Sequence, residues 1–382
     1  MKAINLIKYL IVILDTRATS FCYYENNRGE TSSAPGRFLP LEKLEEAVNF
    51  AIKNDISINF IYGNHTLPAG YDNLIETVKH IKIIPLDRQK QEENAILVIN
   101  PDHQQLIPQL ETEADSQRNI ILRLEKDQLD GLGEIIQSLW GKFRRLNLFL
   151  LDIENYTESD FNRYEEQLKI VENFAVREYK AGSQAEINFL TDRLLLVNMN
   201  NCEAGNNHLT VGPNGKLYLC PGFYYDNPGN SIGNLENGYE IKNSQLLKLN
   251  NAPICKNCDA YHCKRCVYLN KKTTGELNTP SHQQCVLSHL ERNTSGRLLE
   301  AVKPDNEMFR EFTPIPAIPY LDPIDLVNGH PELKMEEEDR ERLTAQILSK
   351  PLEKLSSKEL LYRVYKLDKD LLTRLKRINH GE

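Results

Sequence analysis

The sequence predicts an α/β protein in which a partial (β/α) barrel precedes a cysteine-rich metal-binding segment and a helical tail. Apolar runs of strand length alternate with amphipathic helical stretches up to about residue 200, as in βαβ units built around a parallel sheet. Seven of the eight cysteines then gather between positions 202 and 285. We therefore expect three domains, at residues 1–200, 201–293 and 294–382.

The barrel prediction begins with the apolar run from Tyr9 to Leu14, which we interpret as a buried strand. It is too short to span a bilayer, and Asp15, Thr16 and Arg17 follow it where a signal peptide would have a small-residue cleavage site. Further strands are predicted over 56–62, 81–85, 95–100, 119–124, 146–151 and 193–197. Helices are predicted over 41–52, 74–80, 131–144 and 158–179.

The cysteines follow an order that suits a metal or iron–sulfur module. Cys202 is followed by twelve residues, Gly215, four residues and Cys220, and the second part reads Cys255-x2-Cys258-x4-Cys263-x2-Cys266 with Cys285 eighteen residues later. Residues 208–219 predict a hairpin, because Pro213-Asn214-Gly215 supplies a tight turn. Thiolates are the ligands that soft metals and iron–sulfur clusters require.

This order resembles the seven-cysteine SPASM domain, the auxiliary-cluster module of radical SAM peptide-modifying enzymes. That family has CxxC-x5-C-x3-C, so each of the last two gaps is one residue shorter here. The segments Asn278–Ser281 and Ser288–Asn293 around Cys285 look more specifically like the CXXX repeat peptide maturases. The resemblance covers about residues 200–293.

The resemblance implies two [4Fe-4S] clusters and assigns their ligands. Three cysteines look like ligands of one cluster whose fourth position is open or filled from elsewhere: Cys202, Cys220 and Cys266. Four look like ligands of the other: Cys255, Cys258, Cys263 and Cys285. Asp259 and Arg265 would adjust the cluster potential through charge and hydrogen bonds, or be solvated surface groups.

The N-terminal half is similar to a radical SAM barrel that has lost its radical-generating site. Such a barrel carries C-x3-C-x2-C after its first strand, and this chain reads Asp15-x3-Thr19-x2-Cys22-Tyr23. The GGEP-type motif after the second strand is replaced by Tyr62-Gly63-Asn64-His65-Thr66-Leu67-Pro68, which lacks the acidic residue. The resemblance thus implies a degenerate partial (β/α) barrel with a SPASM-like domain, and binding of S-adenosylmethionine is not expected. Alternatively, Cys22 is an ordinary buried thiol.

Zinc remains an alternative at the cysteine module. Cys255, Cys258, Cys263 and Cys266 would suit one tetrahedral zinc ion. Cys202, Cys220 and Cys285 would then be unused, unless a second ion took them together with histidines. The candidate histidines are His208, His262 and His282.

Composition limits the functional classes. The net charge of −8 and the isoelectric point near 5.7 oppose general nucleic-acid binding. The low cysteine content and the CxxC pairs indicate a reducing, cytoplasmic location. Beyond Cys285 we expect an extended Pro-rich segment over 304–323, an acidic run over 336–339 and an amphipathic helix over 360–375.

Three functional hypotheses follow. In the first, the chain is an accessory maturation protein that binds a CXXX-repeat precursor peptide or a radical SAM partner and relays electrons. In the second, it is an enzyme that acts on peptide cysteines at an open iron site. In the third, it is a zinc-stabilised peptide-binding module. Enzymatic activity is thus left open, and no catalytic residue is assigned.

Overall fold

The computed structural model describes residues 7–25, 37–91, 95–110, 118–199, 202–318 and 321–323, and the single residues 345, 349, 351 and 354. The chain divides into two compact units, Met1–Ile324 and Asp325–Glu382, and the first is described below. The expected acidic run and the helix at 360–375 fall outside the described residues. No helix in the described ranges is long and apolar enough to cross a membrane.

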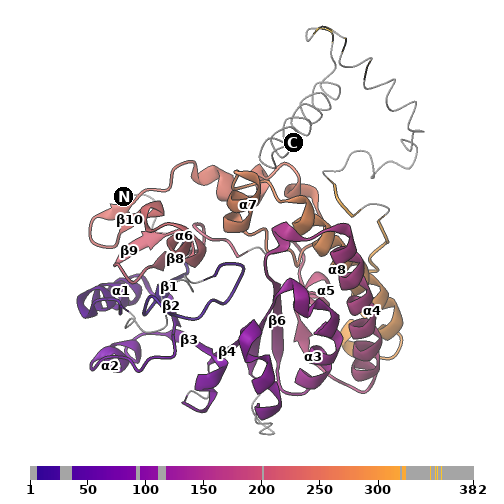
Figure 1. The fold of residues 1–382 in the computed structure, drawn as a ribbon, viewed down its shortest axis with the longest axis horizontal. Helices are drawn as coiled ribbons and strands as arrows, with labels where there is room; N and C mark the ends of the chain where they lie inside the picture. Colours follow the sequence, from indigo (N-terminus) through magenta and orange to yellow (C-terminus); the bar gives the residue numbers. More distant parts are fainter. Residues whose placement is uncertain are drawn as a thin grey trace, which may run out of the picture. The chain divides into compact units, whose positions relative to one another are not determined.

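One mixed sheet organises the first unit, which confirms the predicted α/β class (Figure 1). Its eleven strands have the order β11-β10-β9-β8-β1-β2-β3-β4-β5-β6-β7, and the run from β8 through β1 to β7 is parallel. The strands are β1 (Tyr9–Ile13), β2 (Ser57–Ile61), β3 (His80–Pro85), β4 (Ile96–Ile99), β5 (Asn119–Leu124), β6 (Arg145–Leu150), β7 (Glu186–Ile187), β8 (His208–Val211), β9 (Lys216–Tyr218), β10 (Gly233–Asn234) and β11 (Gly238–Tyr239).

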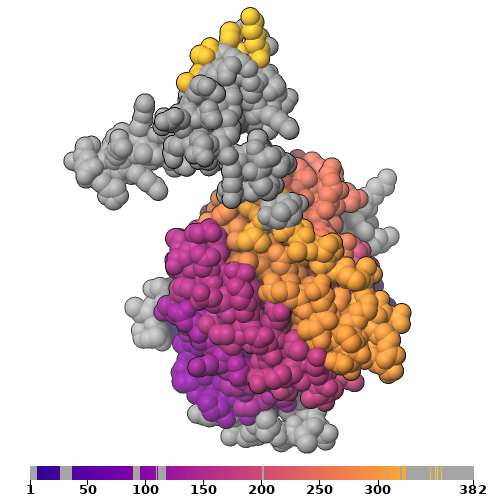
Figure 2. Space-filling view, turned by 90° about the vertical axis from the view of Figure 1, so that its right-hand side faces the viewer, coloured from indigo at the N-terminus to yellow at the C-terminus, as the bar shows by residue number. Residues whose placement is uncertain are grey.

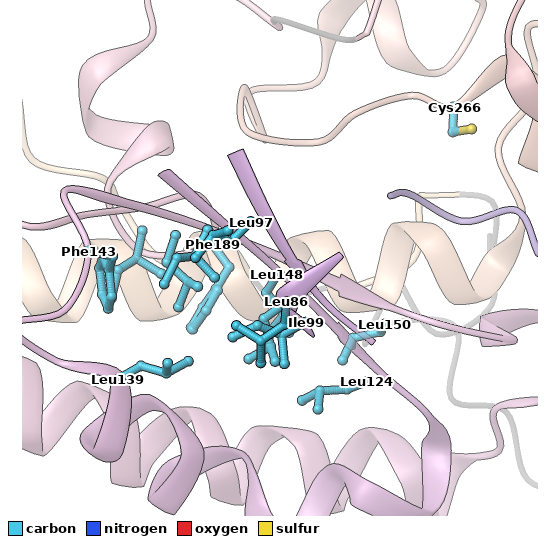
Figure 3. Packing of buried hydrophobic residues seen from close by; sticks show 14 of the residues in the cluster. Leu86, Leu97, Ile99, Leu124, Leu139, Phe143, Leu148, Leu150, Phe189 and Cys266 are labelled. Atoms are coloured by element: carbon cyan, nitrogen blue, oxygen red, sulfur yellow. The ribbon is translucent and has the colours of Figure 1, made fainter. Parts of the chain in front are cut away.

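The middle strands are largely apolar because both of their faces are covered, although β5 also carries the buried Arg123. Ile120 and Leu122 of β5 belong to the main core, which packs against the helices, whereas Ile121 joins Ile83 and Val98 in a small cluster of its own. Figure 3 shows side chains of β4, β5 and β6 gathered opposite Leu139 of helix α3, with Cys266 on a loop away from them.

Amphipathic helices bury their apolar stripes against this sheet. The helices are α1 (Leu41–Asn54), α2 (Tyr71–Ile75), α3 (Leu132–Leu139), α4 (Glu158–Lys180), α5 (Asp192–Leu195), α6 (Pro221–Asp226), α7 (Val267–Thr274) and α8 (His282–Val302). Helix α4 begins at a capping box formed by Thr157 and Asp160. Helices α4 and α8 lie side by side, as Figure 2 shows from outside.

Three predicted elements are wrong in type or extent. The helix expected over 74–80 ends at Ile75, and His80 instead begins β3, because that segment pairs with Ile58 of β2. The strand expected over 193–197 is the short helix α5, where the Thr191 hydroxyl bonds the backbone of Ile187 and turns the chain. The helix expected over 131–144 is α3, which stops at Leu139 so that β6 can begin at Arg145.

The cysteine-rich segment continues the same sheet. Strand β8 pairs in parallel with β1, and the predicted hairpin over 208–219 is present as β8 and β9, with Gly215 at φ 72° in its turn. Helix α8 runs through the domain boundary expected at residue 293. The Pro-rich segment expected to be extended contains a short 3-10 helix at Glu307–Phe309. It packs back on the unit, since Phe309 and Ile315 are buried in the main core.

Candidate metal centre

The eight cysteines of the chain are free thiols, and their mutual electrostatic effects divide them into two sets. The first thiol set consists of Cys22, Cys202, Cys220 and Cys266. The second thiol set consists of Cys255, Cys258, Cys263 and Cys285. Seven of these were singled out from the sequence. Cys22, which was linked there only to the lost radical motif, is added by its place in the fold.

In the first thiol set, burial is the main cause of the raised thiol pKa values, and neighbouring thiolates add to it. The pKa of Cys220 is raised well above its usual value by desolvation and then by the charges of Cys22 and Cys202. The pKa of Cys266 is raised by desolvation and then by the charges of Cys202, Cys220 and Cys22. Packing agrees for two members of the set, because Cys22 packs against the apolar cluster that contains Cys220.

Backbone contacts bring the three distant segments of the first thiol set together. Cys220 and Cys266 are the residues that precede helices α6 and α7, and the two helix starts touch: a Cβ added at Gly222 would lie 2.6 Å from the Tyr268 ring. Cys202, the exposed member, donates its backbone N–H to the carbonyl of Lys264 at 3.3 Å. The Sγ atom of Cys266 accepts the Leu269 N–H at 3.5 Å, and a helix N-terminus of this kind favours thiolate.

The second thiol set is held by one tight loop and the first turn of α8. Desolvation and then the charge of Cys263 raise the pKa of Cys255 to about 12. The pKa of Cys285 is raised by desolvation and by the charges of the other three thiols and of Asp322. The Sγ atom of Cys258 accepts the Ala260 N–H at 3.4 Å. This loop therefore already turns sulfur toward backbone donors.

Arg265 lies between the two sets. Arg265 is 2% exposed. Burial lowers the pKa of its guanidinium, and the charges of Cys255, Cys202 and Cys263 act in the opposite direction. Arg265 is therefore close to thiols of both sets. Its Nη2 donates to the Leu247 carbonyl, whereas Nε and Nη1 have no hydrogen-bond partner within the described part of the chain. A buried guanidinium with unused donors is costly unless negative charge faces it. The alternative of a solvated surface group is therefore wrong for Arg265.

Asp259 anchors the loop of the second thiol set from outside. Its carboxylate accepts two hydrogen bonds from Arg292, at 2.6 and 2.8 Å, and one from Arg193 at 3.0 Å. Burial opposes ionisation, but these hydrogen bonds prevail and hold its pKa at about 2. The pair of guanidinium groups thus fixes the loop to helices α8 and α5.

The histidines considered as zinc ligands have other contacts. His282 pairs with Asp322 at 2.5 Å, and His262 lies 3.1 Å from the Glu291 carboxylate. His208 stacks on Tyr9, and burial lowers its pKa to about 4. His289, which was not considered from the sequence, lies with Nε2 3.5 Å from the Sγ atom of Cys258.

The spacing of the thiols bears on the choice between iron–sulfur clusters and single zinc ions. Among the described residues, no three His, Cys, Asp or Glu side chains are arranged to hold one metal ion. In a [4Fe-4S] cluster each thiolate binds a different iron, so the ligand sulfurs are farther apart than around one ion.

A separate cavity of about 420 Å³ lies near the ends of β1 to β5, where the degenerate motifs fall. Gly63, Asn64 and His65 line it beside Arg17 and Thr19. Gly63 cannot carry a side chain, because a Cβ would lie 2.7 Å from the Asp15 carboxylate. Asp15 and Thr19 stand at the positions of the two absent cysteines. Asp15 is buried, and the Thr19 hydroxyl accepts a hydrogen bond from Asn100 at 3.0 Å.

Comparison with known proteins then adds information on the fold. No protein-family model matches the chain, and no curated protein matches it in sequence. Solved structures do match, among them "Native anSMEcpe with bound AdoMet and Cp18Cys peptide" at 13% identity and "Native anSMEcpe with bound AdoMet and Kp18Cys peptide" at 14% identity. Each match has a TM-score of 0.52 and covers 78% of this chain and 99% of the other.

The chain has the fold of these two solved structures. That finding confirms the predicted fold class. At this level of identity it extends to the fold alone.

Proposed function

We propose that the chain is an accessory protein of peptide maturation. It binds two iron–sulfur clusters and serves a radical SAM partner and a ribosomally made precursor peptide with CXXX repeats. Its place of action is the cytoplasm, where thiols stay reduced. The observation that carries the proposal is that the fold and both thiol sets are present while Asp15 and Thr19 replace two radical-cluster ligands.

The barrel's own chemistry supports an accessory role. A cluster that binds S-adenosylmethionine needs three thiolates at this loop and one free iron, and neither an aspartate nor a threonine is a soft ligand. Asp15 is fully buried, and desolvation is the largest cause of its raised pKa. The Arg17 N–H donates to it at 2.5 Å. These residues therefore pack the loop instead of binding iron.

The arrangement of the thiols supports clusters over a zinc knuckle. A knuckle would use Cys255, Cys258, Cys263 and Cys266 together. Cys266, however, is affected by the charges of Cys202, Cys220 and Cys22, whereas Cys255 and Cys258 are affected by the charge of Cys263. Bound clusters would supply one-electron transfer, and the chain's own residues would bury them and set their charge environment through Arg265.

The first experiment measures iron, zinc and acid-labile sulfide in anaerobically purified protein, together with its visible absorption. We expect about eight iron and eight sulfide per chain, as two [4Fe-4S] clusters require. One or two zinc ions without visible absorption would refute the relay role and favour a zinc-stabilised peptide-binding module.

The second experiment tests the partner role with a CXXX-repeat peptide, the same peptide with its cysteines replaced by alanine, and a candidate radical SAM maturase. We expect the chain alone to leave the peptide unchanged and to raise the turnover of the maturase. Modification of the peptide by this chain alone would contradict the proposal and favour an enzyme with an open iron site.

A further inference from the structure

The first thiol set raises the question of what completes it. Of the seven cysteines in the module, four form the second thiol set, which leaves only Cys202, Cys220 and Cys266 for the first. A [4Fe-4S] cluster held entirely by protein has four cysteine ligands. A fourth ligand must therefore come from another part of the chain, or one iron stays accessible to other molecules.

We propose that Cys22 supplies the fourth thiolate of the first cluster. This inference rests on the proposed function, since it requires that the chain binds iron–sulfur clusters. It assigns a new use to the loop after β1. The last cysteine of the degenerate motif serves the C-terminal module in place of a radical-generating site.

The position of the loop carries the argument. Arg123 of β5 is fully buried and donates from Nε to the Cys22 carbonyl at 3.0 Å and from Nη2 to the Tyr24 carbonyl at 2.8 Å. On its other side, the Tyr24 ring stacks on Tyr225 of α6, with ring centroids 5.3 Å apart and planes at 10°. The loop is thus fixed between β5 and the helix that follows Cys220.

The Cys22 side chain shares an apolar cluster with Cys220 and is not among the residues that line the barrel cavity. It packs against the apolar cluster that contains Cys220, Phe223 and Tyr225. The cavity is lined instead by Thr19, Ser20 and Arg123 of the same region.

Arg265 gives independent support for an anionic group at this place. Its Nε and Nη1 are buried and have no hydrogen-bond partner among the described residues. A cluster with four thiolates carries negative charge that these donors can satisfy. Cys22 would add the fourth of those charges to the first cluster.

The consequence is functional. With four thiolates, no iron of the first cluster is left for a substrate, so this cluster can transfer electrons but cannot bind a peptide thiol. The loop that would hold a radical cluster also becomes a covalent link between the barrel and the module. The inference therefore separates the relay hypothesis from the hypothesis of an enzyme with an open iron site.

The test compares the full-length wild type with Cys22→Ala by iron content and by electron paramagnetic resonance of the reduced clusters, with and without added cyanide. We expect the wild-type spectrum to be unaffected by cyanide. In Cys22→Ala one of the two cluster signals should shift on adding cyanide, and mild oxidation should produce a [3Fe-4S] signal from loss of the unprotected iron. Tyr23→Phe, which keeps every thiol in the same loop, should behave like the wild type.

Each outcome decides a different point. A wild type without iron would refute the proposed function itself. If the wild type holds two clusters and one of them responds to cyanide, the proposed role of Cys22 is overturned. This outcome can be observed even if the Cys22→Ala variant does not fold. A Cys22→Ala protein that keeps two cyanide-insensitive clusters would overturn it as well.

Discussion

Gly222 controls how closely the two helices that follow Cys220 and Cys266 approach each other. A Cβ at this position would lie 2.6, 2.8 and 2.9 Å from three ring atoms of Tyr268. The shortest distance is about 0.8 Å below the 3.4 Å at which ordinary contact begins. The ring cannot simply swing away, because it packs edge-on against Phe223 at 5.7 Å.

Replacing Gly222 with Ala should therefore move α6 away from α7. Overpacking of a core typically costs about 1–3 kcal/mol, while Ala in a helix regains up to about 1 kcal/mol over Gly. We expect a net loss of about 1–2 kcal/mol in the free energy of unfolding. Because Cys220 and Cys266 lie at the starts of these helices, we also expect loss of iron from the first cluster only.

The assay combines urea unfolding with iron and sulfide analysis of the same preparation. Gly131→Ala is the matched control, because its Cβ would meet its nearest neighbour at 3.9 Å, and it should retain full iron and wild-type stability or slightly more. A second control, Gly222→Ala with Tyr268→Leu, should recover iron, since contacting residues couple by about 0.5–3 kcal/mol.

One result would refute this reasoning. If Gly222→Ala retained all its iron and unfolded at the same urea concentration as Gly131→Ala, the contact between α6 and α7 would not determine the spacing of the two thiols. Equal loss of iron from both clusters would show instead that the variant unfolds the module as a whole.

Further predictions concern single side chains. Arg123→Met should lower the free energy of unfolding by about 3–5 kcal/mol, because it leaves the buried carbonyl groups that accept from Arg123 without a donor. As a control, Arg310→Met at an exposed ion pair should change the free energy of unfolding by under about 1 kcal/mol. Similar urea midpoints for the two variants would disprove the anchoring role of Arg123. Cys263→Ala should lose about half of the iron, and retention of all iron would exclude it as a ligand. Asp160→Asn should cost about 1–2 kcal/mol near neutral pH. Burial opposes ionisation of Asp160, but hydrogen bonds from Lys126 and Thr157 lower its pKa below 3.8. The stability difference between the wild type and Asp160→Asn should therefore be complete above pH 3.8 and should vanish as the pH falls further. A stability difference that stays constant with pH would contradict this prediction. Reduced, reconstituted protein should leave S-adenosylmethionine intact, and release of deoxyadenosine would show a working radical site.

Much of the fold was predictable because its signals are local. The apolar run at Tyr9–Ile13 and the strand at Asn119–Leu124 are bounded by polar residues, and the helix at Glu158–Lys180 has both a capping box and a long amphipathic pattern. The segments at 74–80 and 193–197 were misassigned because their neighbours decide their type. His80 pairs across to Ile58, and Thr191 bonds back to Ile187.

The candidate site divides in the same way. The sequence by itself predicted which cysteines belong to a metal module, because ligand spacing in a short loop is a property of the chain. It also determined that the radical motif is incomplete, since Asp15 and Thr19 cannot replace thiolates. Only the tertiary structure decided that Cys22, nearly two hundred residues before Cys220, lies beside it. That proximity depends on β1 pairing with β8 and on Arg123 and Tyr225 fixing the loop between them, which are long-range contacts that leave no trace in the spacing of residues.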